Sequence, residues 1–193
     1  MTKGHPWASF VRLAVVLVLV VVSAAVFAQN LSKPTAEQVE RGRYLVTLGG
    51  CGDCHSPKKL TAQGPMEDEA LLLSGHPASE PVPPAPTGVG APGMWAAACS
   101  MSFTAWYGPW GISFASNLTP DEKTGLGAWT ADQFVQAMRT GKHRGFGRQI
   151  LPPMPWPNLA KLPDDDLKAI FAYLHSIKPI NNQVPVPQPP AGH

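Results

Sequence analysis

Two of the chain's three cysteines, Cys51 and Cys54, lie within the segment GGCGDCHSPKK of residues 49–59, and His55 directly follows the second. One turn of chain between two thiols lets each thiol add to one of the two vinyl groups of a haem, and the adjacent imidazole can then bind the iron. The C-x-x-C-H spacing therefore predicts one covalently attached haem c. A chain with this motif has to fold around a large, flat, apolar cofactor.

Three other uses of a close cysteine pair fit this sequence less well. A zinc site needs a fourth ligand, usually from a second Cys or His pair at short spacing, and the other histidines beyond residue 28 are isolated. A redox-active C-x-x-C pair starts a helix after a strand, whereas a predicted helix and two glycines precede Cys51. A plain disulfide between Cys51 and Cys54 leaves His55 without a role.

Iron held by one histidine has a sixth position that a methionine, a histidine or nothing can fill. Met138 lies in a predicted helix and is expected in the core, whereas Met154 lies in ILPPMPWP. Prolines at 152, 153 and 155 stiffen the backbone on both sides of Met154. We therefore predict Met154 as the sixth ligand, with Met101 as the competing candidate. The alternative role of Met154 is to fill a gap in the core.

The first 28 residues have the pattern of a targeting segment. Lys3 and Arg12 precede an apolar run over residues 13–27, and Val26-Phe27-Ala28 offers a cleavage site before Gln29. This pattern predicts a signal peptide over residues 1–28, and the alternative is an uncleaved membrane anchor at residues 13–27. Either one places the protein in the periplasm or on the outer face of the cytoplasmic membrane. Without this segment the chain carries 13 basic and 13 acidic residues, which argues against a nucleic-acid partner.

Three helices and a short hairpin are expected. The helices follow Thr35, follow Thr130, and cover most of LPDDDLKAIFAYLHSI, where three aspartates stand at the positive end. Gly49-Gly50 and Gly141 are expected to end the first two helices. Alternating polar and apolar residues around Gly108-Pro109 are typical of a hairpin. The proline-rich residues 74–93 predict a surface loop, and residues 181–193 predict a disordered tail.

Three stretches resemble a known family: residues 115–134 (ASNLTPDEKTGLGAWTADQF), 152–156 (PPMPW) and 164–174 (DDDLKAIFAYL). With the C-x-x-C-H motif, they resemble class I-type single-haem cytochromes c. More narrowly, they resemble the cytochrome c subunits and domains of periplasmic alcohol, aldehyde and nicotinate dehydrogenases. The resemblance covers residues 36–66 and 111–178 and implies a mainly α cytochrome c domain over residues 29–180. Residues 67–110 match poorly and are expected to form an insertion.

The resemblance also assigns roles to individual residues. Cys51 and Cys54 would form the thioethers, His55 would be the proximal ligand and Met154 the distal one. Trp129 would donate its indole N–H to a haem propionate, or else serve as a core aromatic residue.

The same resemblance implies that the N-terminal helix crosses the C-terminal helix through a small residue and aromatic side chains. Gly42 and Tyr44 would lie on one side of that crossing, with Phe171 and Leu174 on the other.

The function implied is single-electron transfer rather than catalysis. A dehydrogenase would donate the electrons, and an oxidase or another cytochrome would accept them. The dehydrogenase subunits of this type usually carry three haem motifs and this chain has one, which favours a separate carrier over a permanently docked subunit. An enzyme or gas sensor with open iron is the remaining alternative and requires that Met154 does not bind.

Two further features concern the surface. Cys99 has no cysteine partner once a haem takes the other two, so it is a lone thiol or a small buried apolar residue. Basic residues precede Met154 at Arg139, Lys142, Arg144 and Arg148, and Lys58-Lys59 follow His55. These basic stretches are expected either to dock an acidic partner or to be ordinary solvated surface.

Overall fold

A computed structural model describes residues 33–190. The predicted signal peptide, with its alternative as an anchor, lies outside these residues. Chain contacts separate Met1–Thr35 from Ala36–His193, and the fold described here is that of the second unit. No helix within residues 33–190 is long and apolar enough to cross a membrane.

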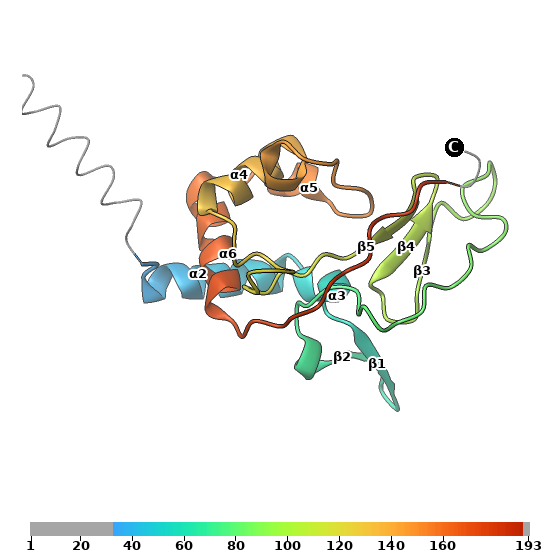
Figure 1. The fold of residues 1–193 in the computed structure, drawn as a ribbon, viewed down its shortest axis with the longest axis horizontal. Helices are drawn as coiled ribbons and strands as arrows, with labels where there is room; N and C mark the ends of the chain where they lie inside the picture. The colour runs from blue at the N-terminus through green and yellow to red at the C-terminus, as the bar shows by residue number, and fades with distance from the viewer. Residues whose placement is uncertain (1–32, 191–193) are drawn as a thin grey trace, which may run out of the picture. The chain divides into compact units, whose positions relative to one another are not determined.

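The first and last long helices cross each other, as expected. These helices are α2 (Ala36–Leu48) and α6 (Asp164–Ser176), and they pack together at Gly42 (Figure 1). A Cβ atom added to Gly42 would lie 1.9 Å from the Ala169 carbonyl oxygen, so the crossing requires a residue without a side chain. The expected aromatic partner Tyr44 instead lies 52% exposed. Its side chain points away from the core, where Val46 of the same helix is buried.

A third long helix, α4 (Ala131–Thr140), packs against α6. Thr130 and Gln133 form the predicted capping box, and Gly141 ends the helix in the left-handed region at φ 65°. The short helix α5 (Trp156–Leu159) packs against α4, and the one-turn helix α3 (Cys51–His55) follows α2 directly. Two 3-10 turns, η1 (Glu69–Leu71) and η2 (His143–Gly145), complete the helical elements of the described residues.

The core lies among α2, α4 and α6. Its buried members are Val46, Leu73, Leu126, Phe134, Val135, Ala137, Met138, Leu167, Ile170, Phe171 and Leu174. Met138 is therefore a core residue, as predicted.

Two small antiparallel sheets lie outside this helical core. Strands β1 (Lys58–Thr61) and β2 (Gly64–Glu67) form one hairpin. Strands β3 (Ala98–Cys99), β4 (Ala105–Gly108) and β5 (Gly111–Phe114) form the other sheet in that order. Strands β4 and β5 pair Gly108 with Gly111, so the chain turns at the glycine-proline step from which the hairpin was predicted.

The tail corrects one prediction, because residues 181–190 are held against the domain. Asn182 donates its side-chain amide to the carbonyl oxygens of Ser74 and His76, both at 2.8 Å. Ile112 and Gln188 exchange two backbone hydrogen bonds, which lays the tail along β5 (Figure 1). Proline-rich composition predicted disorder, but an extended proline-rich chain can also dock as an edge strand where its few N–H groups find acceptors.

Candidate haem site

The two cysteines of the C-x-x-C-H motif lie on α3, and both are free thiols. Gly50, at φ 61° in the left-handed region, turns the chain from the end of α2 into α3. Cys51 is half-buried and packs against the helical core, and Cys54 is also half-buried. The one-turn helix thus places the Cys51 sulfur against apolar surface, with Cys54 half-buried three residues later on the same turn.

His55 is buried at the end of α3, and one of its ring nitrogens is already engaged. Its Nδ1 lies 2.7 Å from the carbonyl oxygen of Ser116. A carbonyl can only accept, so Nδ1 carries the proton and Nε2 keeps its lone pair for a metal. Burial lowers the pKa of His55, although the Ser116 carbonyl acts in the opposite direction. The imidazole is therefore neutral near pH 7, the form that binds iron.

Both thiols are poor candidates for reactive thiolates. Burial raises the pKa of Cys51 to about 11, and the neighbouring Asp53 carboxylate acts in the same direction. Burial also raises the pKa of Cys54, against a smaller opposing effect of Lys58. Redox-active C-x-x-C pairs depend on a lowered thiol pKa, so this environment argues against thiol–disulfide exchange.

A structural zinc site finds no support in the described residues. Within residues 33–190, no group of three or more His, Cys, Asp or Glu side chains is placed to hold a metal ion. The two thiols and His55 do fit a covalent haem, which needs thiols near apolar surface and one oriented imidazole.

Met154 differs in its setting from the methionines of the insertion and its flanks. Its side chain is half-buried and packs against the same core as Cys51. In contrast, Met66, Met94 and Met101 are 54%, 60% and 74% exposed. Of these four methionines, only Met154 packs against the hydrophobic cluster that Cys51 of the C-x-x-C-H helix also contacts.

Trp129 also packs against the core and is half-buried. The His143 ring meets it edge-on with centroids 4.7 Å apart, and the Arg144 guanidinium lies 5.5 Å from the centre of its ring. Arg144 takes a left-handed φ of 55°, and its Nε is buried without a hydrogen-bond partner. Both predicted roles of Trp129, core packing and donation to a propionate, are compatible with this arrangement.

Some cations of the two basic stretches form ion pairs with carboxylates, and others do not. Lys59 forms an ion pair with Asp68 at 2.9 Å, Lys58 lies 3.8 Å from Glu67, and Arg139 pairs with Asp164. Within residues 33–190, no ion pair involves the cations of the η2 loop, which are Lys142, Arg144 and Arg148. We call residues 142–148 the cationic loop.

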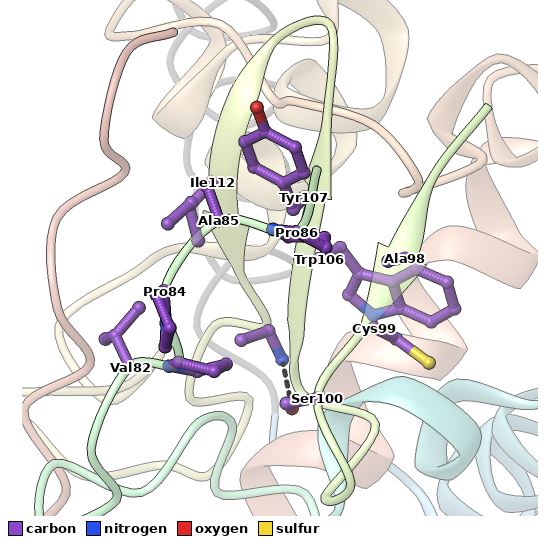
Figure 2. Close-up of a pocket in the computed structure, with 12 residues that line it drawn as sticks. Val82, Pro84, Ala85, Pro86, Ala98, Cys99, Ser100, Trp106, Tyr107 and Ile112 are labelled. Atoms are coloured by element: carbon purple, nitrogen blue, oxygen red, sulfur yellow. Dashed lines mark hydrogen bonds between the residues drawn. The ribbon is translucent and has the colours of Figure 1, made fainter. Parts of the chain in front are cut away.

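Cys99 lies on β3 and is exposed. It borders a groove of about 210 Å³ between the proline-rich residues 82–86 and strands β3 and β4 (Figure 2). Trp106 pairs with Cys99 across the two strands and lines the same groove. The buried-residue interpretation of Cys99 is therefore wrong, and the thiol is open to solvent.

The sequence analysis missed two contributors to the site. Ser116 orients His55 through a backbone carbonyl, which any residue type supplies, so its position carries no sequence signal. Lys58 donates its ammonium to the carbonyl oxygens of Gly52 and Ser56, at 2.6 and 2.7 Å, and so closes the end of α3. A lysine shortly after a helix is a known signal for such a contact, but a weak one.

Comparison with known proteins finds relatives among cytochrome c subunits. The chain is 30% identical over 155 residues to the gluconate 2-dehydrogenase cytochrome c subunit of Pantoea cypripedii, covering 78% of this chain and 26% of that protein. It is 38% identical over 80 residues to the cytochrome c subunit of the quinone alcohol dehydrogenase of Gluconobacter oxydans, covering 41% and 16%. The chain is a relative of dehydrogenase cytochrome c subunits.

A third relative is the fructose dehydrogenase cytochrome subunit of Gluconobacter japonicus, 27% identical over 153 residues, which are 79% of this chain and 24% of that protein. The chain thus spans between about a sixth and about a quarter of the length of these three relatives. No family model matches the sequence.

Proposed function

We propose that this protein is an electron-carrying cytochrome c with one haem, which Cys51 and Cys54 would bind covalently and whose iron His55 and Met154 would bind. The observation that carries the proposal is the shared core: the C-x-x-C-H helix and the Met154 loop pack against one hydrophobic cluster. The number of haems follows from the single C-x-x-C-H motif in the chain.

The haem would supply one-electron chemistry by cycling between ferrous and ferric iron. The protein's residues would hold it and set its environment. The two thiols would fix it covalently, and the Ser116 carbonyl would keep the His55 ring in one orientation and increase its basicity. A soft, neutral thioether from Met154 would favour ferrous iron. Trp129 would position a propionate through its indole N–H.

The relatives support a dehydrogenase as the electron donor, because all three are named as cytochrome subunits of dehydrogenases. We propose that the acceptor is an oxidase or another cytochrome. The cationic loop, with unpaired cations and Phe146 77% exposed between them, is our candidate docking surface for an acidic partner. The predicted targeting segment supports a location in the periplasm or on the outer face of the cytoplasmic membrane.

A second candidate is a permanently docked electron-transfer subunit. Its support is an exposed apolar group in the insertion, where Trp95 is 81% and Met94 60% exposed. Exposed apolar side chains indicate an interface where they form a contiguous patch. Size-exclusion chromatography of native extracts separates the two candidates, because a free carrier elutes at its own mass and a docked subunit elutes with its complex.

An absorbance spectrum with and without carbon monoxide tests the proposal. We expect the reduced protein to show the bands of a six-coordinate c-type haem and carbon monoxide to leave them unchanged. A reduced spectrum that shifts on addition of carbon monoxide would show open iron and favour an enzyme or gas sensor. A protein without haem bands would contradict the proposal altogether.

A further inference from the structure

The β4–β5 hairpin is hydrogen-bonded to the loop that carries Met154. Ser113 of β5 is 6% exposed, and its hydroxyl donates to the carbonyl oxygen of Pro152 at 2.6 Å. The same hydroxyl oxygen accepts from the indole N–H of Trp110 at 3.1 Å. The Trp106 carbonyl oxygen also lies within reach of this hydroxyl, but at 3.4 Å, so the single proton goes to the nearer Pro152 carbonyl. A serine hydroxyl can donate once and accept at the same time, so the bonds to Pro152 and Trp110 form together and polarise each other.

Trp110 is itself fixed by the turn of the hairpin. A Cβ atom added to Gly108 would lie 2.5 Å from the Trp110 ring, so the indole lies flat against backbone that only glycine leaves open. The tail, paired with Ile112, covers the other edge of β5. Ser113 therefore stands on a strand that is held on both sides.

Apart from the packing of Met154 against the core, few hydrogen bonds hold the Met154 loop. Prolines 152, 153 and 155 have no N–H to donate, and the Met154 amide makes only a local bond of 3.3 Å to Leu151. Within residues 33–190, the Ser113 hydroxyl provides the side-chain hydrogen bond that joins residues 151–154 to a strand. Losing it would leave both the Pro152 carbonyl and the Trp110 N–H without a partner.

We infer that Ser113, backed by Trp110, is a positioning residue that holds the Met154 sulfur at its binding position. This inference rests on the proposed ligation by Met154. Residues 67–110 match the family poorly. Through Trp110, this region would also contribute to the site. The hairpin would set how often the methionine leaves the iron.

The rate of cyanide binding to the ferric protein measures this opening, because cyanide can bind only when the sixth position is free. We expect Ser113→Ala to bind cyanide about fivefold faster than wild type, the factor that one lost hydrogen bond corresponds to. The reduction potential should fall in the same variant, since a less firmly bound thioether stabilises ferrous iron less. Ser113→Thr, which keeps the hydroxyl, should restore both values.

Two further variants separate positioning from general stability. Ser100→Ala removes a hydroxyl from the connection between β3 and β4, which accepts from the Ala105 amide at 3.2 Å, and should leave the cyanide rate unchanged. Trp110→Phe removes the indole N–H together with part of the ring and should increase the rate by less than Ser113→Ala. It serves as the test if Ser113→Ala fails to fold.

A Ser113→Ala protein that is less stable to heat but keeps the wild-type cyanide rate and potential would overturn the inference. An equal acceleration in Ser100→Ala would also overturn it. If Met154→Ala behaves like wild type in the same assay, the proposed ligation has failed instead.

Discussion

His55 has one ring nitrogen available because the other is held by the Ser116 carbonyl at 2.7 Å. That single contact fixes the tautomer, and burial keeps the ring neutral. Burial raises the pKa of both neighbouring thiols, which disfavours the thiolate form that disulfide exchange needs. The residues of α3 are therefore suited to receive a cofactor rather than to exchange disulfides.

Replacement of Met154 tests the sixth ligand. Met154→Ala should abolish the weak near-infrared band of sulfur-to-iron charge transfer in the ferric protein and let carbon monoxide bind the reduced form. Met154→His should lower the reduction potential by on the order of 0.1 V, within the roughly 0.8 V span that axial ligands set. Optical spectroscopy and a redox titration measure both effects.

Met101→Ala is the matched control, because Met101 is the competing candidate and is 74% exposed. It should leave the near-infrared band and the potential as in wild type. Loss of the band in Met101→Ala, together with its retention in Met154→Ala, would mean that the proline-rich loop has another role.

The role of a single residue can be predicted from the sequence where it depends on side-chain type and spacing. Cys51, Cys54 and His55 are of this kind, and Met154 stands out through its proline neighbours. Ser113 and Ser116 could not be predicted, because one acts through a long-range contact and the other through its backbone. Cys99 was misjudged because a lone cysteine gives no sequence signal of its exposure.

The crossing of α2 and α6 is the contact between elements that depends most on one residue. Gly42→Ala would place a methyl group 1.9 Å from the Ala169 carbonyl oxygen, so the two helices would have to separate. We expect the free energy of unfolding to fall by about 1–3 kcal/mol, as for other overpacked sites. Chemical denaturation followed by circular dichroism measures this change.

Leu48→Ala is the control at the exposed end of the same helix, where Leu48 is 68% exposed, and its effect should be within about 0.5 kcal/mol. Helix propensity alone favours alanine over glycine by up to about 1 kcal/mol. A Gly42→Ala protein that is more stable than wild type would therefore contradict the close crossing.

The three long helices could be predicted because each carries local signals in the sequence. Capping residues and a following glycine mark α2 and α4, and α6 has three aspartates in its first turn and an apolar stripe. Thr130, Gln133 and Gly141 show this for α4, where every expected contact forms. The β1–β2 hairpin has no alternation strong enough to signal it. The tail was predicted from composition alone, whereas its docking depends on Asn182 reaching residues more than a hundred positions earlier.

For the molecule as a whole, the unpaired charges of the cationic loop should govern its encounters with anions. We expect the combined Arg144→Glu and Arg148→Glu variant to be oxidised by ferricyanide about tenfold more slowly than wild type at low ionic strength. The difference should disappear at about 1 M salt, where screening acts within about 3 Å. Stopped-flow absorbance across a salt series measures it.

Lys123→Glu with Lys178→Glu is the control, since it changes the net charge equally away from this loop. An equal slowing in both double variants would mean that only net charge matters. The cationic loop would then have no special role in docking.

The central claim is that one haem is covalently bound through Cys51 and Cys54. It is tested most directly by the intact mass of the protein after extraction with acid acetone, using protein exported from a host that attaches haem to C-x-x-C-H motifs. We expect the mass of the polypeptide plus one haem, and loss of that addition when both cysteines are changed to serine. A haem that extracts, or a mass that fits no haem or two haems, would contradict it.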